Sequence, residues 1–338
     1  MSQIRFLSGA QTRGLLKMNE VIAAVEGVYR AKAQKQVCVW PLVCHEFEPG
    51  VADMDIKSGC INTQGIHGLK MVNWFSKNAQ KGLPDLSGIV MVSDSTTGMP
   101  LGILEGGYIT CMRTGAAGAI GAKALARKDA ENLMILGAGG QALYQIAASL
   151  LLLPQIKTVR IADPLSAERA KQFAASIAAR LSEELGVDAA GVEFIGCSTV
   201  EEGVRSSDII ITVTPARTPL IRAEWVKQGT HFSCIGADMP GKEEIDPEIF
   251  RGARVFGDDR TQCFDVGECE LAHKSGCLAE DGFLGEIGQV LTGQIEGRLR
   301  AEDITIFDAT GMALLDLAAA KLALDEAQVQ QVGTVVEL

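Results

Sequence analysis

The sequence predicts an α/β protein in which a doubly wound parallel sheet is joined to a smaller α+β domain. The chain has 338 residues, 47% of them hydrophobic, and so has enough apolar side chains for two cores. Beyond about Asp129, short β-rich runs alternate with amphipathic helical segments, which is typical of βαβ units and a parallel sheet. Before Asp129, strand-like runs are separated by turn residues, which favours an antiparallel sheet flanked by helices.

The amino-terminal region opens with a predicted helix at residues 18–32, where apolar side chains recur at helical spacing. Strand-like segments follow at residues 37–48, 68–75 and 88–93. Turn residues from Asp94 to Gly98 separate the last of these segments from Leu101, which predicts a hairpin.

The central region predicts a series of strands with connecting helices. The strands are residues 133–136, 159–162, 192–195, 209–213, 231–235, 255–256 and 304–307. The helices lie around residues 141–152, 167–185 and 199–204, and a capping box that starts at Ser198 opens the last of them.

A final helix is predicted from Met312 to about Ala327. It has an apolar face that needs a partner, and we expect it to return to the first domain. The predicted domains are therefore residues 1–118 together with residues 312–338, and residues 119–311.

The composition limits the partners of the chain. Forty-two acidic and 31 basic residues give a net charge of −11, which opposes binding to nucleic acid or to an anionic membrane surface. No apolar stretch is long enough for a membrane span, and the first residues lack the apolar segment of a signal peptide. Nine cysteines without a C-x-x-C pair predict reduced thiols and a cytoplasmic protein.

A glycine-rich turn follows the predicted strand at residues 133–136 and opens a helix, so its G-x-G-x-x-A motif stands in the context of a Rossmann-type dinucleotide-binding domain. The first glycine permits a tight turn, the second lets the backbone approach a pyrophosphate, and the alanine allows close packing of helix on strand. Backbone N–H groups and the helix dipole then bind the phosphates. The cofactor-binding residues predicted here are Gly137, Gly139, Gly140, Gln141 and Ala142.

The same turn could bind nothing, or a different nucleotide such as adenosylmethionine. Asp163 favours NAD, because it ends the next strand, where its carboxylate can accept hydrogen bonds from a ribose hydroxyl pair. No arginine directly follows Asp163 to hold the 2′-phosphate of NADP, although Arg169 lies one turn into the helix. A P-loop motif is absent from the sequence.

Several further segments resemble the ornithine cyclodeaminase/μ-crystallin family. They are Gly68 to Val72, Arg113 to Ala117, the glycine turn, Gly236 to Lys242, Gly285 to Gly288 and Phe307 to Gly311. The resemblance runs from Lys70 to Ala318, and the motifs together, in this order, are highly specific. It implies a homodimer whose first domain, completed by the final helix, binds substrate and forms the subunit interface, while the central domain binds NAD.

Three residues are candidates for the chemistry of an amino-acid substrate. Arg113 offers a planar donor fork suited to a carboxylate, and it precedes a small-residue segment that we expect to begin a helix. Lys70 lies among apolar residues of a predicted strand; if it is buried, it can bind a carboxylate or donate a proton, which is the role that the resemblance implies. Asp238 follows a strand at the carboxyl edge of the parallel sheet and is the predicted general base, although a turn-forming aspartate fits this position equally well.

Residues of lower rank complete the predicted site. The resemblance places Thr114 near the cofactor, and residues just beyond strand ends could line the dinucleotide groove: Thr214, Gly236, Thr310 and Gly311. The four histidines form no metal-binding motif, so no metal is expected, but His45 falls in a segment that should face the substrate.

One expected feature of the family is missing. Family members commonly carry a substrate-binding arginine before the first-domain hairpin, whereas this chain has no arginine between Arg30 and Arg113. A glutamate used in the cyclodeaminase type also has no clear counterpart. Our hypothesis is that Lys57 supplies the missing positive charge, although a solvated loop lysine is equally compatible with the sequence.

The resemblance implies hydride transfer at the α-carbon of an L-amino acid with loss of ammonia, as in the conversion of ornithine to proline. An alanine-type dehydrogenase and a cyclic ketimine reductase are alternatives that use the same residues. A non-catalytic μ-crystallin-like ligand-binding protein is an alternative of another class. The expected partners are thus small amino acids or cyclic imines.

Overall fold

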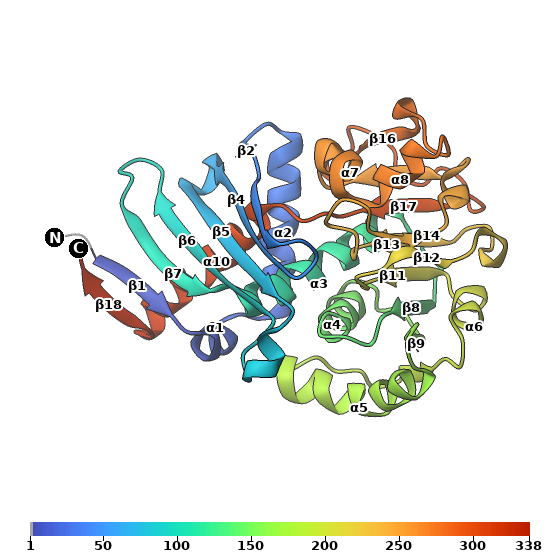
Figure 1. Cartoon of the computed structure of the whole chain (residues 1–338), viewed down its shortest axis with the longest axis horizontal. Helices are drawn as coiled ribbons and strands as arrows, with labels where there is room; N and C mark the ends of the chain where they lie inside the picture. Colours follow the sequence, from blue (N-terminus) through green and yellow to red (C-terminus); the bar gives the residue numbers. More distant parts are fainter. Residues whose placement is uncertain (1–2) are drawn as a thin grey trace. The chain divides into compact units, whose positions relative to one another are not determined.

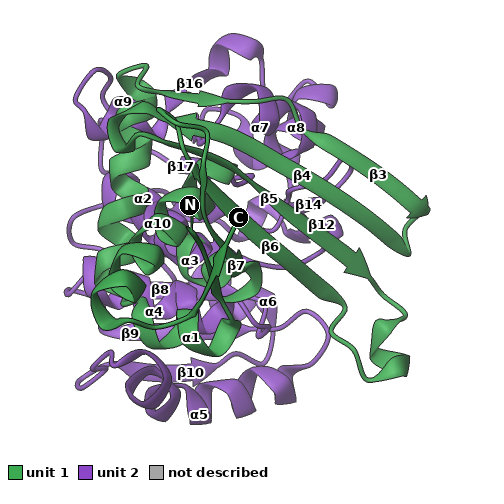
Figure 2. Ribbon diagram, turned by 90° about the vertical axis from the view of Figure 1, so that its left-hand side faces the viewer, with its two compact units in different colours: residues 1–113, 312–338 green, residues 114–311 purple. Residues whose placement is uncertain are grey.

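The computed structural model describes residues 3–338. The chain divides into two compact units, which are residues 1–113 with 312–338 (unit 1) and residues 114–311 (unit 2). Figure 2 colours unit 1 green and unit 2 purple. The division falls slightly before the predicted boundary at residue 118, inside helix α3 (Gly106–Leu125).

Unit 1 contains a mostly antiparallel sheet of eight strands. The strands are β1 (Gln3–Leu7), β2 (Val37–Val39), β3 (Val43–Glu48), β4 (Ala52–Ile61), β5 (Ile66–Phe75), β6 (Leu86–Asp94), β7 (Pro100–Glu105) and β18 (Thr334–Glu337). Their order is β18-β1-β7-β6-β5-β4-β2, with β3 also paired to β4. The predicted hairpin is confirmed, because β6 and β7 pair antiparallel across the turn that Asp94 begins.

The strand-like region predicted at residues 37–48 is confirmed and consists of two strands. It is divided into β2 and β3 by Trp40-Pro41-Leu42. Proline has no N–H for a strand ladder, so pairing is interrupted where it stands. Both pieces still pair with β4, Val39 opposite Gly59 and Val43 opposite Ile56.

The helices of unit 1 are α1 (Gly9–Leu15), α2 (Met18–Ala33) and α10 (Ala313–Gln330), with short 3-10 turns at Asn62–Gln64 and Asn78–Lys81. Helix α10 packs against strands β4 to β7 and against α2, which gives its apolar face the expected partner (Figure 1). Two glycines allow the close approach. A methyl group on Gly59 would lie 2.8 Å from Leu314, and one on Gly68 would lie 2.8 Å from Leu317.

The opposite face of this sheet is apolar and largely exposed. Strand alternation directs Phe6, Val43, Phe47 and Ile89 away from α10. Their exposed fractions are 38%, 54%, 57% and 38%.

Unit 2 contains an eight-stranded sheet in which every neighbouring pair is parallel. The strands are β8 (Asn132–Leu136), β9 (Thr158–Ala162), β10 (Glu193–Gly196), β11 (Ile209–Thr212), β13 (His231–Cys234), β15 (Arg254–Gly257), β16 (Phe283–Glu286) and β17 (Thr305–Asp308). Their order is β10-β9-β8-β11-β13-β17-β15-β16. The chain moves outward from β8 to β10, then outward on the other side from β11 to β16, and the last strand, β17, is inserted between β13 and β15. This confirms the predicted doubly wound, Rossmann-type sheet.

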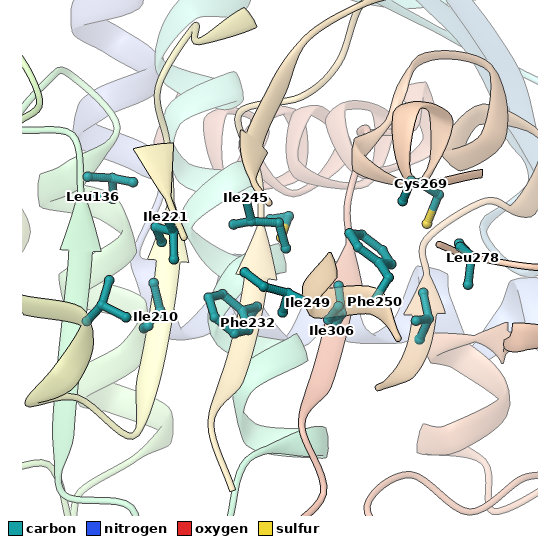
Figure 3. Close-up of a cluster of buried hydrophobic side chains, with 14 of the residues drawn as sticks. Leu136, Ile210, Ile221, Phe232, Ile245, Ile249, Phe250, Cys269, Leu278 and Ile306 are labelled. Atoms are coloured by element: carbon teal, nitrogen blue, oxygen red, sulfur yellow. The ribbon is translucent and has the colours of Figure 1, made fainter. Parts of the chain in front are cut away.

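The helices of unit 2 are α4 (Ala142–Leu152), α5 (Ala167–Leu185), α6 (Val200–Arg205), α7 (Arg260–Val266), α8 (Glu268–Lys274) and α9 (Ile287–Leu291). A small second sheet pairs β12 (Arg217–Ile221) with β14 (Glu243–Ile245), and 3-10 turns occur at Ala223–Trp225, Pro247–Phe250 and Glu280–Gly282. Ile210, Phe232 and Ile306 come from neighbouring strands and form a core with Ile245 and Phe250 (Figure 3). The carboxyl ends of β8, β11 and β13 are thereby fixed beside one another.

Within residues 3–338, no helix combines the length and the apolar character that crossing a membrane requires.

Candidate active site

Unit 1 holds a buried cluster formed by Lys70 of β5, Arg113 of α3 and Asp316 of α10. One carboxylate oxygen of Asp316, Oδ1, lies 3.2 Å from Lys70 Nζ and 3.2 Å from Arg113 Nε. The side chains are 5%, 10% and 0% exposed, respectively, so the ion pairs lie out of water. Lys70 also donates to Thr110 Oγ1 at 2.6 Å.

The local sequence explains why this cluster is buried. Strand alternation places Lys70 on the same face of the sheet as Gly68, and this face is covered by α10. Asp316 lies in the first turn of α10, where the helix dipole favours a carboxylate. Lys70 is therefore buried, with Asp316 as its internal partner. The sequence alone had not decided whether Lys70 faces solvent or the interior.

Burial lowers the pKa of Lys70 to about 8; the Asp316 carboxylate opposes this change, whereas Arg113 and Lys57 add to it. Burial alone would raise the pKa of Asp316, but Arg113 and Lys70 outweigh burial and hold this pKa below its usual range. Asp316 is thus an anion, and Lys70 is close to its titration point at neutral to mildly alkaline pH.

Lys57 lies directly opposite Lys70 in the pairing of β4 with β5. Lys57 therefore lies in a strand, on the same face of the sheet as Lys70. The alternative that Lys57 is a loop lysine is wrong. His45 projects from the other face. Its register partner is Met54, and alternation along β4 places Met54 on the face opposite Lys57. His45 and Lys70 are consequently on opposite sides of the unit 1 sheet.

Asp316 was missed in the sequence. Its signal was an acidic residue between Leu315 and Leu317, at a position where α10 is otherwise buried. A carboxylate in such a setting requires internal cations.

The expectation that a helix begins just after Arg113 is wrong. Helix α3 begins at Gly106, so Arg113 and Thr114 lie in its interior. Glu105 accounts for the earlier start, because its carboxylate accepts N–H groups of Gly107 and Tyr108 in the first turn. Thr114 therefore cannot offer a helix amino terminus to phosphate, and its carbonyl accepts the Gln145 side-chain amide.

The glycine turn of unit 2 has the shape that a dinucleotide requires. Gly137 has φ +111°, which favours glycine. A methyl group at Gly139 would meet only Arg169 Nη2, at 3.9 Å, and one at Gly140 would meet nothing within 4 Å. Ala142 is fully buried, which provides the close packing that we predicted. The turn thus leaves its backbone open on the side where a pyrophosphate would bind.

A second observation supports the fit of a dinucleotide. The side-chain oxygen Oε1 of Gln141 is buried and has no hydrogen-bond partner within the described chain. Asp163 lies just past β9, and its Oδ2 accepts the Ala138 N–H at 3.2 Å, which ties the end of β9 to the turn. Its Oδ1 accepts the Leu165 and Ser166 N–H groups. The residues present therefore suit the group that the motif predicts.

We expect Asp163→Ala to raise KM for NAD by about 10- to 100-fold, the loss that removal of a charged hydrogen-bond acceptor gives. The preference for NAD over NADP should fall as well, because Arg169 Nε lies 3.5 Å from Asp163 Oδ2 and would be released toward a 2′-phosphate. Steady-state kinetics with both cofactors measure this change. Arg180→Ala, in the same helix, is the control, and an unchanged NAD to NADP ratio in the Asp163 variant would refute the assignment.

The strand-end residues Thr214 and Gly236 are brought together and pinned by Glu244. One oxygen of Glu244 accepts both the N–H and the hydroxyl of Thr214, at 2.6 and 2.7 Å. The other accepts the Gly236 N–H at 3.0 Å. Burial raises the pKa of Glu244, and burial with the nearby charge of Glu244 raises that of Glu268 well above its usual value.

Thr310 and Gly311 are held in the same manner. Asp258 follows β15 and accepts the N–H groups of both residues, at 3.2 and 2.7 Å, together with the Thr310 hydroxyl. Two buried carboxylates, those of Glu244 and Asp258, thus fix the loops at the carboxyl edge of the parallel sheet. Neither was identified from the sequence, because an acidic residue beyond a strand end resembles any turn residue.

Asp238 lies four residues beyond β13 and is 47% exposed. Its Oδ1 pairs with Lys242 Nζ at 2.5 Å. The loop that carries both residues is tied to α8, where Glu270 accepts the Gly241 N–H at 2.7 Å. Asp238 is therefore an accessible carboxylate on an anchored loop, which suits a group that exchanges protons.

No metal centre is seen in the described chain. Among residues 3–338, no group of three or more His, Cys, Asp or Glu side chains could hold a metal ion. His231 is buried between Thr305 and Ser233, and burial lowers its pKa to about 3, so it is neutral and structural.

Comparisons with known proteins agree with this architecture. A model of the ornithine cyclodeaminase/mu-crystallin family matches residues 3–331. The chain is 35% identical over 328 residues to an alanine dehydrogenase of Archaeoglobus fulgidus, covering 97% of this chain and 96% of that protein.

Two solved structures are similar over essentially their whole length. One is an archaeal alanine dehydrogenase dimer with bound NAD, with a TM-score of 0.90, 34% identity and 100% of both chains covered. The other is the Thermococcus litoralis Δ(1)-pyrroline-2-carboxylate reductase in complex with NADH and L-proline. Its TM-score is 0.89 and its identity 30%, covering 98% of this chain and 99% of that chain.

Proposed function

The chain belongs to the ornithine cyclodeaminase/mu-crystallin family, and from this we propose that it is an NAD(H)-dependent enzyme that transfers a hydride to or from the α-carbon of a small amino acid or its imine. The observation that carries the proposal is the buried pair of cations, Lys70 and Arg113, whose ion pairs both end on Asp316. Two cations and one internal anion leave positive charge for the carboxylate that every α-amino acid carries.

Lys70 and Arg113 bind this carboxylate in the proposed mechanism. Arg113 contributes a planar fork that matches two carboxylate oxygens, and Lys70 contributes a point charge. Lys57, opposite Lys70, supplies positive charge in place of the family's usual arginine, which this chain lacks between Arg30 and Arg113. Together they fix the α-carbon in one orientation, which is the main requirement for hydride transfer.

NAD(H), when bound, supplies or accepts the hydride. The residues that would hold it are those of the glycine turn, Gly137 to Ala142, with Asp163 on a ribose. Further residues of its groove are Thr114, Thr214, Gly236, Thr310 and Gly311. NADP is disfavoured because the carboxylate of Asp163 would repel a 2′-phosphate.

Asp238 is the proposed general base. In the oxidative direction the amino acid loses its α-hydrogen as hydride and a proton from nitrogen, and Asp238 accepts a proton in this step. Water then adds to the carbon of the resulting imine, ammonia leaves, and an oxo acid remains. In the reductive direction Asp238, once protonated, returns the proton to nitrogen.

Net amino-acid oxidation or imine reduction is our first choice. The two relatives described above are named for these reactions. The cyclodeaminase type uses a glutamate for which this chain has no clear counterpart, and strand β4, which pairs with the strand of Lys70, contains no glutamate. Cyclisation of ornithine to proline with loss of ammonia is the second candidate, because it needs the same cations and the same base and gives the family its name.

We also propose that the protein forms a homodimer through the exposed apolar face of unit 1. Isolated apolar side chains are normal on a protein surface, but several exposed apolar side chains on the same face of β1, β3 and β6 indicate an interface. The archaeal alanine dehydrogenase with a similar fold is a dimer.

Ile89→Glu should weaken such a dimer by at least about 30-fold, because the new carboxylate would be buried against apolar side chains. Sedimentation velocity over a concentration series measures the change. Leu165→Glu changes a side chain of unit 2 that is 85% exposed, and it should leave the dimer intact. Equal association of the wild type and Ile89→Glu would exclude this face as the interface.

The proposed function is tested by following NADH absorbance and ammonia together, with alanine, ornithine, lysine and proline in the presence of NAD, and with cyclic imines in the presence of NADH. Net NADH formation or consumption supports a dehydrogenase or reductase. Ammonia from ornithine without net NADH would establish cyclisation instead. NADH binding without turnover of any compound would contradict catalysis of this type and favour a ligand-binding role.

A further inference from the structure

We propose that Asp316 is a positioning residue that sets the charge of Lys70 and the orientation of Arg113 for binding of a substrate carboxylate. The inference rests on the proposed function of Lys70 and Arg113. It goes beyond that function because Asp316 is itself buried beneath the two cations and acts through them.

Arg113 is held through the inner nitrogen of its guanidinium group. Its ion pair with Asp316 uses Nε, at 3.2 Å, and not a terminal nitrogen. Within residues 3–338, the two terminal Nη groups of Arg113 form no hydrogen bond. A guanidinium held through Nε keeps its plane fixed while both terminal nitrogens stay available for a bidentate carboxylate. Asp316 therefore orients the guanidinium group of Arg113 and leaves its terminal nitrogens to the substrate carboxylate.

The Lys70 ammonium has two polar contacts, with Thr110 and with Asp316. Thr110 Oγ1 donates to the Gly106 carbonyl at 2.7 Å, so it can only accept from the Lys70 ammonium. Asp316 Oδ1 accepts from the same ammonium at 3.2 Å. Both contacts favour the protonated form, and Asp316 provides the only ion pair that Lys70 makes within the described residues.

Titratable and charged groups from three elements surround Lys70. Strand β4 contributes Lys57, helix α3 contributes Arg113 and the weakly acidic thiol of Cys111, and helix α10 contributes Asp316. Burial and the two neighbouring cations lower the pKa of Lys70, while Asp316 is the carboxylate that raises it. Without Asp316, deprotonation of Lys70 would relieve both the burial of a charge and the repulsion from its neighbours.

The pH dependence of activity reports the charge of Lys70. If protonated Lys70 binds the substrate carboxylate, kcat/KM falls as the pH rises through the Lys70 pKa. Asp316→Asn should move this basic limb to lower pH by about one unit or more, the shift expected when an opposite charge within a few ångströms is removed. KM for the substrate should rise by at least about 10-fold at neutral pH, while binding of NADH should stay unchanged.

The experiment measures kcat/KM against pH for the wild type and Asp316→Asn, and it records the Lys70 ¹⁵Nζ resonance of lysine-labelled protein across the same pH range. Lys70→Met assigns the resonance. Asp325→Asn is the matched control, because Asp325 lies on the same helix and pairs with Lys321 near the surface. The proposal is supported if, in Asp316→Asn but not in Asp325→Asn, the basic limb of kcat/KM and the titration of Lys70 both move to lower pH.

An unchanged limb and an unchanged Lys70 titration in a folded Asp316→Asn variant would overturn it. If this variant does not fold, Asp316→Glu is measured instead. This variant keeps the charge but displaces the fork, so we expect a basic limb near that of the wild type and a raised KM, and an unchanged KM would overturn the proposal. If the wild type turns over no substrate, the proposed function fails, and the Lys70 titration still decides the role of Asp316.

Discussion

Asp238→Asn should lower kcat by about 10²- to 10⁴-fold, the usual contribution of a positioned general base. The amide cannot accept the proton that leaves the substrate nitrogen, while its size and its place beyond β13 stay the same. KM for NADH and the melting temperature should change little, because Asp238 is 47% exposed and its pair with Lys242 is local. Pre-steady-state kinetics of NADH formation measure the chemical step directly.

Asp281→Asn, at an exposed acidic residue of the turn Glu280–Gly282, provides the control for loss of a surface charge. A kcat of Asp238→Asn within a few-fold of the wild type would show that another group accepts the proton. Asp238 would then be a turn-forming aspartate, as its sequence context also allows.

Lys70→Met should lower kcat/KM for the amino acid by about 10²- to 10³-fold, because a buried charge that binds the substrate carboxylate is lost. The variant should fold, since Arg113 still pairs with Asp316 and methionine fills a similar volume. The loss should appear mainly in KM if Lys70 binds substrate and transition state equally, and in kcat as well if it orients the α-carbon.

Lys77→Met is the matched control, since Lys77 lies just after β5 and pairs with Glu48 at the surface. If Lys70→Met and Lys77→Met had equal kcat/KM, Lys70 would not contact the substrate. Asp316 would then have no role in catalysis through Lys70.

The parts of the fold that the sequence predicted correctly are those with strong local signals. The glycine turn is the clearest example, because a tight turn with positive φ, an open backbone and a buried alanine each require one kind of residue. The alternation of short apolar strands with amphipathic helices likewise indicated the parallel sheet of unit 2.

The parts that it could not predict depend on contacts between distant residues. Asp316 lies far along the chain from Lys70 and Arg113, and only the packing of α10 on the unit 1 sheet reveals that the three meet. The same holds for Glu244, whose partners Thr214 and Gly236 come from separate strand ends. The start of α3 was missed for a different reason, since two glycines at its first positions disfavour a helix until Glu105 caps them.

The choice among reactions within this family is a matter of what reaches the imine carbon. Water gives an oxo acid, a second amine of the substrate gives a ring, and a cyclic imine that enters from solution is simply reduced. In the proposed mechanism all three reactions would use the same carboxylate-binding pair and the same base. The shape of the pocket would then decide which of the three takes place.

Hydride transfer from the α-carbon is the central claim, and isotope transfer tests it most directly. The enzyme is incubated with NAD and with alanine, ornithine or proline deuterated at the α-carbon, and the cofactor and products are analysed by mass spectrometry. We predict deuterium in the reduced cofactor for a dehydrogenase substrate, or in the ring product if the hydride returns. Loss of the deuterium to water, with none in the cofactor or product, would contradict the account.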